Sequence, residues 1–573
     1  MQTIGFGIHS HPTRGPHYRQ EGREFLIRIN HRFNILATCS VKSGKGRTPG
    51  NNILDGFHRL DLRVTVLSKT MNLVSAFAGS VENQSTKIAL YWGERTYTYL
   101  DLWNQSTFVS KQLQKRFGVK SGARVGLWLK NCPEFIPAFF GIQHAGGVAV
   151  PINSFLKPDE VSYILNDAGI DVLVTDAEFE SSFAALTASR PALQMFLTQD
   201  ITEFANQPPE SVQARSVNTR DLPTISESAL AVLIYTSGTT GRPKGAMLSQ
   251  SNLLHNVESC RKVLHTIATD RLAVLLPLFH SYMLTVGILL PLLVGGSIVL
   301  VKSIHPVRNA FQEIFQRQAT ILPGIPQFYR SMIHAPIQPP LPLRLCVSGS
   351  APLPAQILHE FEARFHIPLI EGYGLSEASP VVTKNPLDAT RKPGSIGLPI
   401  PDVEVSIQDD TGRQLPPKQI GELCVRGGNV MMGYWNQPEE TAKVMREGWL
   451  LTGDIGYRDE EGYYYITDRK KDMLLVNGIN VYPREIEEIL YQFPGVKEAA
   501  VIGKPDPRKG EHPVAFVAAN DGAVLEEQAI QHFLRRKLAD YKVPRKVVML
   551  PFLPRTATGK ILKTDLRDRP IAD

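Results

Sequence analysis

An eleven-residue segment, Tyr235–Gly245 (YTSGTTGRPKG), has the composition of a phosphate-binding loop. It follows the apolar run 231–234 and combines three glycines with four small hydroxyl residues. Such residues let backbone N–H groups approach phosphate oxygens closely, and Lys244 adds a positive charge. The GxxxxGK[ST] spacing of a P-loop NTPase fails, because Pro243 or Ala246 stands where the second glycine is required. The segment therefore predicts phosphate binding by a loop of another kind.

Seven further short segments of the sequence match motifs of one known superfamily. Together with the first segment they span about residues 71–570, and they resemble the signature motifs of the adenylate-forming superfamily. That superfamily comprises acyl-CoA synthetases, luciferases and peptide-synthetase adenylation domains, and the chain is most similar to bacterial fatty-acyl-CoA synthetases. The strings are Pro277–His280 (PLFH), Ser348–Leu353 (SGSAPL), Glu371–Glu377 (EGYGLSE), Trp449–Asp454 (WLLTGD), Asp468–Asp472 (DRKKD), Gly478–Glu485 (GINVYPRE) and Pro554–Lys560 (PRTATGK).

The resemblance implies an ATP site. Its phosphate loop and Lys244 are expected to hold the β- and γ-phosphates, Tyr373 to stack on adenine with the 349–351 segment opposite, and Asp454 to accept the ribose hydroxyls. Arg469 is expected near the ribose and the α-phosphate. The ATP-binding residues expected in this way are Thr236, Ser237, Gly238, Thr239, Thr240, Gly241, Lys244, Gly349, Ser350, Ala351, Tyr373, Asp454 and Arg469.

The same resemblance implies the chemistry. Lys560 is expected to bridge the substrate carboxylate and the α-phosphate, because cations must relieve the repulsion between these anions before they can react. Glu377 is expected to bind Mg²⁺, a hard cation that prefers carboxylate oxygen. His280 is expected to gate the acyl pocket. Lys471 is expected to be the hinge of a small rotating domain, and Gly478 to lie beside the CoA thiol tunnel.

The elements that must position these residues alternate between strands and helices. The runs Arg124–Leu129, Gly147–Ile152 and Val172–Thr175 are apolar on both faces, as buried parallel strands are, and the helical segments Glu134–Ala145 and Pro158–Ala168 separate them. This alternation predicts an α/β fold with layered subdomains.

Beyond Pro399 the pattern changes. Half-buried strands are predicted first, at 403–407, 421–426 and 463–466. A compact α+β pattern then follows, with helices at 482–490 and 526–538 and strands at 499–502 and 513–519. We therefore expect a large adenylation domain (71–467) with a β-rich subdomain, a hinge (468–472) and a small, mobile C-terminal AMP-binding domain (473–570).

Net charge separates a leader from this body. The chain has 62 Lys and Arg against 55 Asp and Glu, of which residues 1–70 hold 11 and 4, leaving 51 and 51 for the rest. A neutral body argues against nucleic-acid binding. The leader lacks the apolar stretch of a signal peptide, so we expect a disordered extension or an upstream start ahead of Met71. Five widely spaced cysteines indicate neither a disulfide framework nor a zinc site, which is typical of a cytoplasmic protein.

The stretch Leu272–Val301 holds no Lys, Arg, Asp or Glu, and its last twenty residues are long enough to span a membrane. Pro277, Pro291 and the pair 295–296 interrupt it, however. The interruptions predict a strand at 272–276, a buried helix near 283–293 and a strand at 297–301, with no transmembrane segment. Peripheral membrane association is left open by this pattern.

The activity expected is an ATP-dependent acid–thiol ligase that forms fatty acyl-CoA through an acyl-adenylate and releases AMP and pyrophosphate. Fatty acid, ATP, Mg²⁺ and CoA are its expected partners, and the oligomeric state is left open. Alternatives are a fatty-acyl-AMP ligase that loads a carrier protein, a CoA ligase for aromatic carboxylates, and a non-catalytic nucleotide-binding protein. The short interval between Asp454 and Arg469 favours CoA over a carrier, and the intact set Glu377, Asp454 and Lys560 favours an enzyme. Met283 and Gln327 depart from the family pattern and are expected at the acyl pocket.

Overall fold

The computed structural model describes residues 71–207, 222–237, 242–304, 306–477, 479–506, 510–556 and 559–570, with the backbone of 24–28 and 36–40. Its contacts divide the chain into two units, Met1–Thr70 and Met71–Asp573. In the first unit, β1 (Glu24–Arg28) pairs antiparallel with β2 (Leu36–Ser40). The rest of the leader, for which we expect disorder, lies outside the described residues.

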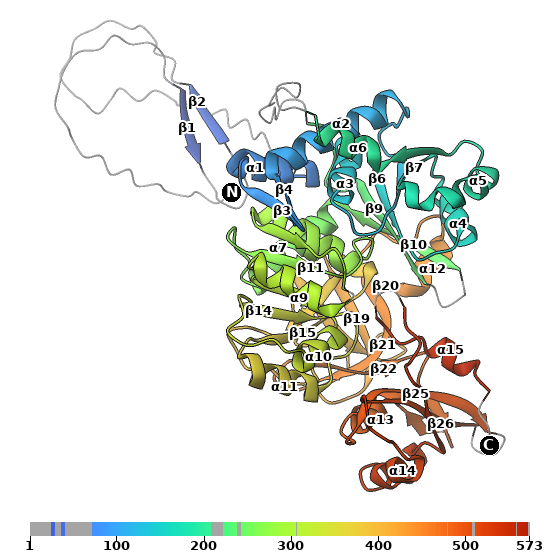
Figure 1. Ribbon diagram of the computed structural model, residues 1–573. Helices are drawn as coiled ribbons and strands as arrows, with labels where there is room; N and C mark the ends of the chain where they lie inside the picture. Colours follow the sequence, from blue (N-terminus) through green and yellow to red (C-terminus); the bar gives the residue numbers. More distant parts are fainter. Residues whose placement is uncertain are drawn as a thin grey trace, which may run out of the picture. The chain divides into compact units, whose positions relative to one another are not determined.

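The second unit contains a six-stranded sheet in the order β10-β9-β6-β5-β7-β8, of which Figure 1 labels β6, β7, β9 and β10. On β6, Val148 and Val150 belong to one hydrophobic core and Ala149 to another, so the sheet is buried on both faces as the apolar runs predict. The strands are β5 (Arg124–Trp128), β6 (Val148–Ile152), β7 (Val172–Thr175), β8 (Gln194–Leu197), β9 (Leu230–Ser237) and β10 (Pro243–Ser249).

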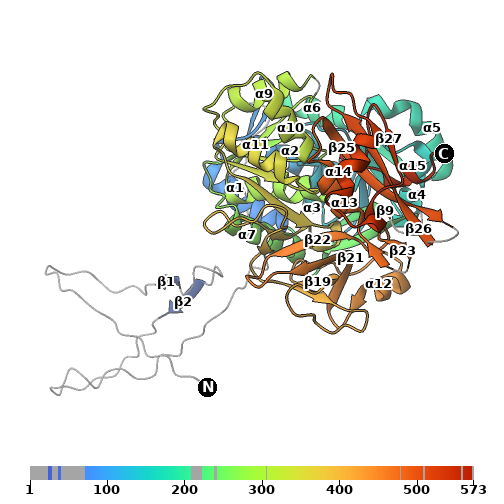
Figure 2. The same ribbon diagram turned by 90° about the horizontal axis from the view of Figure 1, so that it is seen from below.

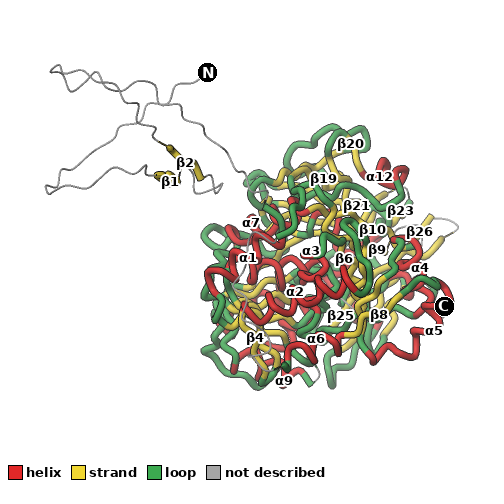
Figure 3. The backbone as a smooth tube through the Cα atoms, turned by 90° about the horizontal axis from the view of Figure 1, so that it is seen from above, coloured by secondary structure: helices red, strands yellow, loops and turns green. Residues whose placement is uncertain are grey.

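Helices pack in groups on this sheet. The helix α1 (Leu73–Gln84) contacts α2 (Tyr99–Lys115) and α3 (Phe135–His144), which Figure 3 shows side by side. The helix α6 (Thr198–Ala205) packs on α2, and α4 (Pro158–Ala168) packs on α5 (Glu180–Ser189). The predicted helices at 134–145 and 158–168 are therefore confirmed to within one or two residues.

A nine-stranded sheet in the order β17-β16-β15-β14-β13-β11-β12-β3-β4 carries most of the predicted motifs. Strands β3 and β11 to β15 are parallel to their neighbours within this set, so their carboxyl ends lie along one edge, where α/β enzymes place their sites. The strands are β3 (Ile88–Trp92), β4 (Arg95–Thr98), β11 (Arg271–Val274), β12 (Ser297–Leu300), β13 (Ile321–Gly324), β14 (Leu345–Ser348), β15 (Leu369–Gly374), β16 (Val381–Lys384) and β17 (Leu398–Pro399).

Helices α7 (Gln250–Val263), α9 (Val307–Gln316), α10 (Pro326–His334) and α11 (Ala355–Phe365) accompany the nine-stranded sheet. The predicted buried helix after β11 has two parts, a π-helical segment η3 (Met283–Leu289) and α8 (Leu290–Val294). Every residue of η3 is buried. Among the described residues, no helix is both long enough and apolar enough to cross a bilayer.

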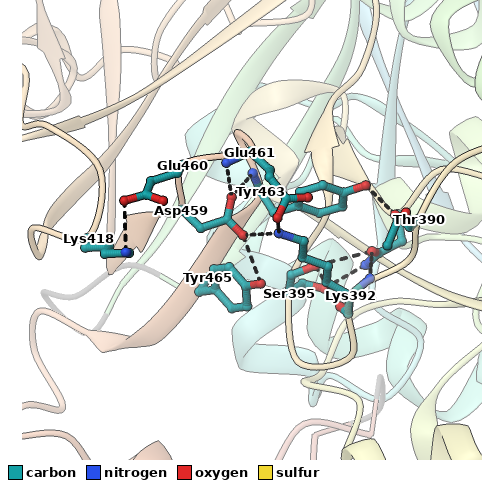
Figure 4. Close-up of polar contacts among 10 residues, drawn as sticks. Thr390, Lys392, Ser395, Lys418, Asp459, Glu460, Glu461, Tyr463 and Tyr465 are labelled. Carbon is teal, nitrogen blue, oxygen red and sulfur yellow. Dashed lines mark hydrogen bonds and ion pairs between the residues drawn. The ribbon is translucent and has the colours of Figure 1, made fainter.

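The β-rich part is a five-stranded sheet of β18 (Val403–Gln408), β19 (Gly421–Gly427), β20 (Met445–Arg446), β21 (Trp449–Arg458) and β22 (Tyr464–Arg469), with α12 (Pro438–Val444) beside it. Figure 4 shows how the hairpin between β21 and β22 is held. Lys392 Nζ lies 2.6 Å from Asp459 Oδ2 and 2.9 Å from Glu461 Oε1, and it lies over the Tyr463 ring. These contacts fix the hairpin whose two strands carry Asp454 and Arg469.

The last 100 residues form a sheet of their own, with the order β24-β23-β26-β25 and β27 beside β26, shown in red in Figures 1 and 2. Its hydrophobic cores contain no residue before Leu474 among those described. Its elements are β23 (Leu474–Val476), β24 (Ile479–Val481), α13 (Pro483–Leu490), β25 (Val496–Asp506), β26 (Gly510–Ala519), α14 (Glu527–Arg535), β27 (Lys546–Met549) and α15 (Lys563–Arg567). The mixed α/β class is confirmed, and the boundary at 468–472 stays a prediction.

Candidate active site

Lys560 lies at the centre of the site, in the turn after β27. The Thr556 N–H donates to the Lys560 carbonyl over 2.8 Å, and the Lys560 N–H donates to Thr556 Oγ1 over 3.1 Å. Gly559 has φ of +82°, and a Cβ there would lie 2.5 Å from Ile325 Cδ1 at the start of α10. A glycine is therefore required for this turn to approach the large domain. Lys560 lines two adjoining cavities, of about 80 and about 580 Å³.

Three predicted nucleotide-binding side chains meet on the β15, β21 and β22 strands. Tyr373 Oη donates to Asp454 Oδ2 over 2.5 Å, and Arg469 Nε lies 3.1 Å from Asp454 Oδ1. Asp454 and Arg469 face each other as antiparallel partners. The carboxylate is 6% exposed while the arginine is 52% exposed, so Asp454 is held in place and Arg469 remains accessible to a ligand.

The segment 349–351 follows β14 and lies beside Tyr373. A Cβ on Gly349 would come within 3.3 Å of the Tyr282 ring, and Ser350 has φ of +65°. Ser350 lines both cavities and Ala351 lines the larger one, as does Tyr373. The structure thus places small residues on the cavity wall next to the aromatic ring, where a flat base can approach the backbone.

The predicted phosphate-binding residues lie where β9 and β10 pair. Thr236 Oγ1 donates to Glu377 Oε1 over 3.3 Å, and Tyr434 Oη donates to the same oxygen over 2.9 Å. Lys244 pairs with Glu440 of α12 and is 8% exposed. Gly238, Thr239, Thr240 and Gly241 lie outside the described residues, as does the side chain of Ser237.

Glu377 offers what a magnesium ion needs from protein. No group of three or more His, Cys, Asp or Glu side chains able to hold a metal occurs among the described residues. Mg²⁺ commonly takes one or two carboxylates and completes its shell with phosphate and water oxygens. A single carboxylate with two hydroxyl groups beside it fits that mode of binding.

His280 lines the smaller cavity together with Lys560. The Tyr282 N–H donates to His280 Nδ1 over 3.2 Å, and the next residue, Ser281, shares a 2.9 Å hydrogen bond with Ser376. Burial, together with the positive charge of Lys560, lowers the pKa of His280 to about 3. The imidazole is therefore neutral at physiological pH. Burial and the charge of Arg469 likewise lower the pKa of Lys560.

Neither Met283 nor Gln327, which were expected at the acyl pocket, lines the smaller cavity. Val286 and Tyr282 line the smaller cavity, whereas Met283 is buried in the core. Gln327 lines the larger cavity instead. The Met283 sulfur lies instead near Gly287, inside the buried η3 segment. Lys471 is exposed and lines the larger cavity, and Gly478 lies outside the described residues.

Contacts between the large domain and the last 100 residues involve residues that the motif analysis did not single out. Arg330 of α10 donates to the Lys497 carbonyl over 2.6 Å, to the Val496 carbonyl over 3.5 Å and to Asn520 Oδ1 over 2.5 Å. Arg484 of α13 lies 4.0 Å from Glu371, which is 3% exposed in the middle of β15. Glu371 opens the EGYGLSE string, so its place in a motif was the available signal.

The chain matches the model of the AMP-binding enzyme family over residues 77–435 and the model of the AMP-binding enzyme C-terminal domain over 485–560. It is 35% identical to a long-chain-fatty-acid–CoA ligase of Bacillus subtilis over 86% of this chain and 94% of that protein. It is 36% identical to a feruloyl-CoA synthase of an Amycolatopsis species over 84% and 95%.

A solved structure, ATP-bound MatB from Rhodopseudomonas palustris, superposes with a TM-score of 0.80 at 33% identity, covering 87% of this chain and 99% of that one. The motifs, the two-part architecture and the nearly full-length matches agree with one another. The chain belongs to the AMP-binding enzyme family.

Proposed function

We propose that this chain is an ATP-dependent acid–CoA ligase that works through an acyl-adenylate and releases AMP and pyrophosphate. The observation that carries the proposal is that Lys560 lines two adjoining cavities. It shares the smaller one with His280 and the larger one with Asp454 and Arg469. The larger cavity suits a nucleotide and the smaller suits an acyl group. The names of the long-chain-fatty-acid–CoA ligase and feruloyl-CoA synthase relatives support acid–CoA ligation.

In the first half-reaction, Lys244 and the 236–241 loop hold the outer phosphates, and Tyr373 and the 349–351 wall hold the base. Asp454 accepts from the ribose hydroxyls. Lys560 then neutralises the carboxylate and the α-phosphate as they approach, the step at which charge repulsion is greatest. Glu377 would hold Mg²⁺, which supplies charge neutralisation on the phosphates. Neutral His280 neither repels Lys560 nor traps the carboxylate.

In the second half-reaction, the small domain rotates about Lys471, withdraws Lys560 and brings Gly478 beside the thiol of CoA. Fatty acids are the expected class of acid, with the feruloyl-CoA synthase relative favouring aromatic acids as a second candidate. A place in fatty-acid metabolism and a cytoplasmic location belong to the same proposal.

The test is a panel of fatty and aromatic carboxylates incubated with ATP and Mg²⁺, with and without CoA, and scored by AMP release and product mass. A thioester that appears only with CoA supports the proposal. Lys560→Ala is the matched control, since it removes one charge and leaves the cavities in place. Acyl transfer to a carrier protein with no thioester from CoA would contradict CoA ligation.

A further inference from the structure

A buried lysine lies in the wall of the smaller cavity. Lys384, the last residue of β16, is 5% exposed and lines this cavity. Its ammonium group donates to the carbonyl of Val263, the last residue of α7. Within the described part of the chain, the ammonium has no ion pair with a carboxylate and no second hydrogen bond, and the Cys260 thiol in the same cavity wall interacts with it electrostatically. Two of its three donors are therefore left for a ligand.

Lys384 lies at the end of the cavity away from the reacting groups. Its ammonium reaches the carboxyl end of α7 at Val263, and its backbone pairs with Gly372 inside β15. Ser376 follows the carboxyl end of β15 and is hydrogen-bonded to Ser281, the neighbour of His280. Extended chain rises about 3.3 Å per residue, so the stretch from Gly372 to residue 375 spans roughly 10 Å. An acid whose carboxylate meets Lys560 thus directs its far end toward Lys384.

The cavity wall is largely apolar. Val286, Val347 and Val381 line it and offer no hydrogen-bonding side chain, while Ser348 and Tyr282 add two hydroxyl groups. A hydrocarbon or aromatic body fits against the valines, whereas a buried ammonium with unused donors loses hydration unless a ligand replaces it. The far end of the cavity therefore differs in chemistry from most of its wall.

A hydroxyl group matches the far end better than a carboxylate does. A hydroxyl accepts from Lys384 and donates to the Val263 carbonyl, so both protein groups gain a partner. The carboxyl end of α7 carries partial negative charge, which repels an anion placed beside Val263. Burial also lowers the pKa of Lys384 to about 7, which weakens its hold on an anion near neutral pH.

We propose that Lys384 and the Val263 carbonyl recognise a hydroxyl group, so that the preferred acid carries a hydroxyl at the end opposite its carboxylate. The inference rests on the proposed acid–CoA ligation and names the class of acid. Two sources offer this chemistry, an ω-hydroxy fatty acid and a phenolic acid such as 4-hydroxycinnamate. Lys384 is then a specificity-determining residue of the acyl cavity.

The experiment compares kcat/KM for two matched pairs, octanoate with 8-hydroxyoctanoate and cinnamate with 4-hydroxycinnamate. In at least one pair we expect the hydroxylated acid to be preferred by about 10- to 100-fold, the range of one or two hydrogen bonds to a cationic group. The pair with the larger preference identifies the body of the natural acid. In Lys384→Met the preference should fall to about one, with octanoate or cinnamate still activated.

Lys87→Met is the control, because Lys87 also donates to backbone carbonyls, those of Ala268 and Gly295, and lines neither cavity. It should keep the hydroxyl preference. Lys384→Gln retains an N–H donor and serves where methionine disturbs folding. Its preference ratio for the hydroxylated acid should lie between the wild-type ratio and one.

No preference for the hydroxyl in either pair, or a preference that Lys384→Met leaves unchanged, overturns the inference. A lower melting temperature of Lys384→Met with an unchanged preference would assign the lysine to capping α7 alone and overturns it equally. In both cases thioester from octanoate or cinnamate leaves the ligase proposal standing. If no acid in the panel releases AMP, both proposals fail.

Discussion

Replacing Glu371 by glutamine should change the pH dependence of folding. Burial raises the pKa of Glu371 to about 7, an effect that Glu488 increases and that Arg484 and the Leu353 N–H oppose. The folded chain therefore keeps a proton that the unfolded chain releases above pH 4.5. The free energy of unfolding of the wild type therefore decreases as pH rises from about 4.5 to about 7, because ionising the buried carboxyl is unfavourable.

The size of the effect follows from the difference between the two pKa values. At 1.36 kcal/mol per unit, the buried carboxyl costs about 1 kcal/mol at pH 5 and about 3 kcal/mol at pH 8. The amide of Glu371→Gln does not titrate and can still accept from Leu353. The free energy of unfolding of the variant, relative to the wild type, should thus increase by about 2 kcal/mol between pH 5 and pH 8.

Urea unfolding of both proteins at the two pH values measures this difference. Glu82→Gln is the matched control, since Glu82 is an exposed residue on α1 and should give the same difference at both pH values within about 0.5 kcal/mol. A Glu371→Gln effect that does not change with pH would refute the reasoning. It would mean that the Arg484 guanidinium keeps the buried carboxyl ionised throughout.

Three further results are expected. Lys560→Ala should lower ATP–pyrophosphate exchange by about 10²- to 10³-fold while thioester formation from a preformed adenylate persists; equal losses in the two assays would contradict rotation of the small domain. Glu440→Gln should lower the KM for ATP by up to about fivefold with kcat unchanged, because Lys244 no longer has a competing carboxylate; an unchanged KM would show that this pair does not oppose phosphate binding. A chain starting at Met71 should match the full chain in thermal melting and in turnover, and loss of either would make the leader part of the enzyme.

Hydrophobic patterning predicted the elements around the site well. Buried strands such as β5 and β7 leave runs that are apolar on both faces, and these were located within a residue or two. The π-helical form of η3 could not be predicted, because all of its residues except Thr285 are apolar and the hydrophobic periodicity then carries little information.

Site residues divide in a similar way. The motif strings led to Tyr373, Asp454 and Lys560, whose meeting in space the structure shows. Arg330 and Lys384 stand outside any motif, and their roles depend on which backbone carbonyls lie beside them. Every residue has a backbone carbonyl whatever its side chain. The sequence therefore does not indicate which carbonyls these two side chains contact.

The Arg330 contact has a consequence for how the two parts of the chain can diverge. Two of its three acceptors are the main-chain carbonyls of residues 496 and 497, which any amino acid provides. Substitutions on the small-domain surface therefore leave most of this docking contact intact. A C-terminal part taken from a related protein could dock on this large domain, provided that its backbone follows the same path at the start of β25. The contact between the two parts of the chain therefore depends little on side-chain identity. The residues that select the acid lie elsewhere in the chain.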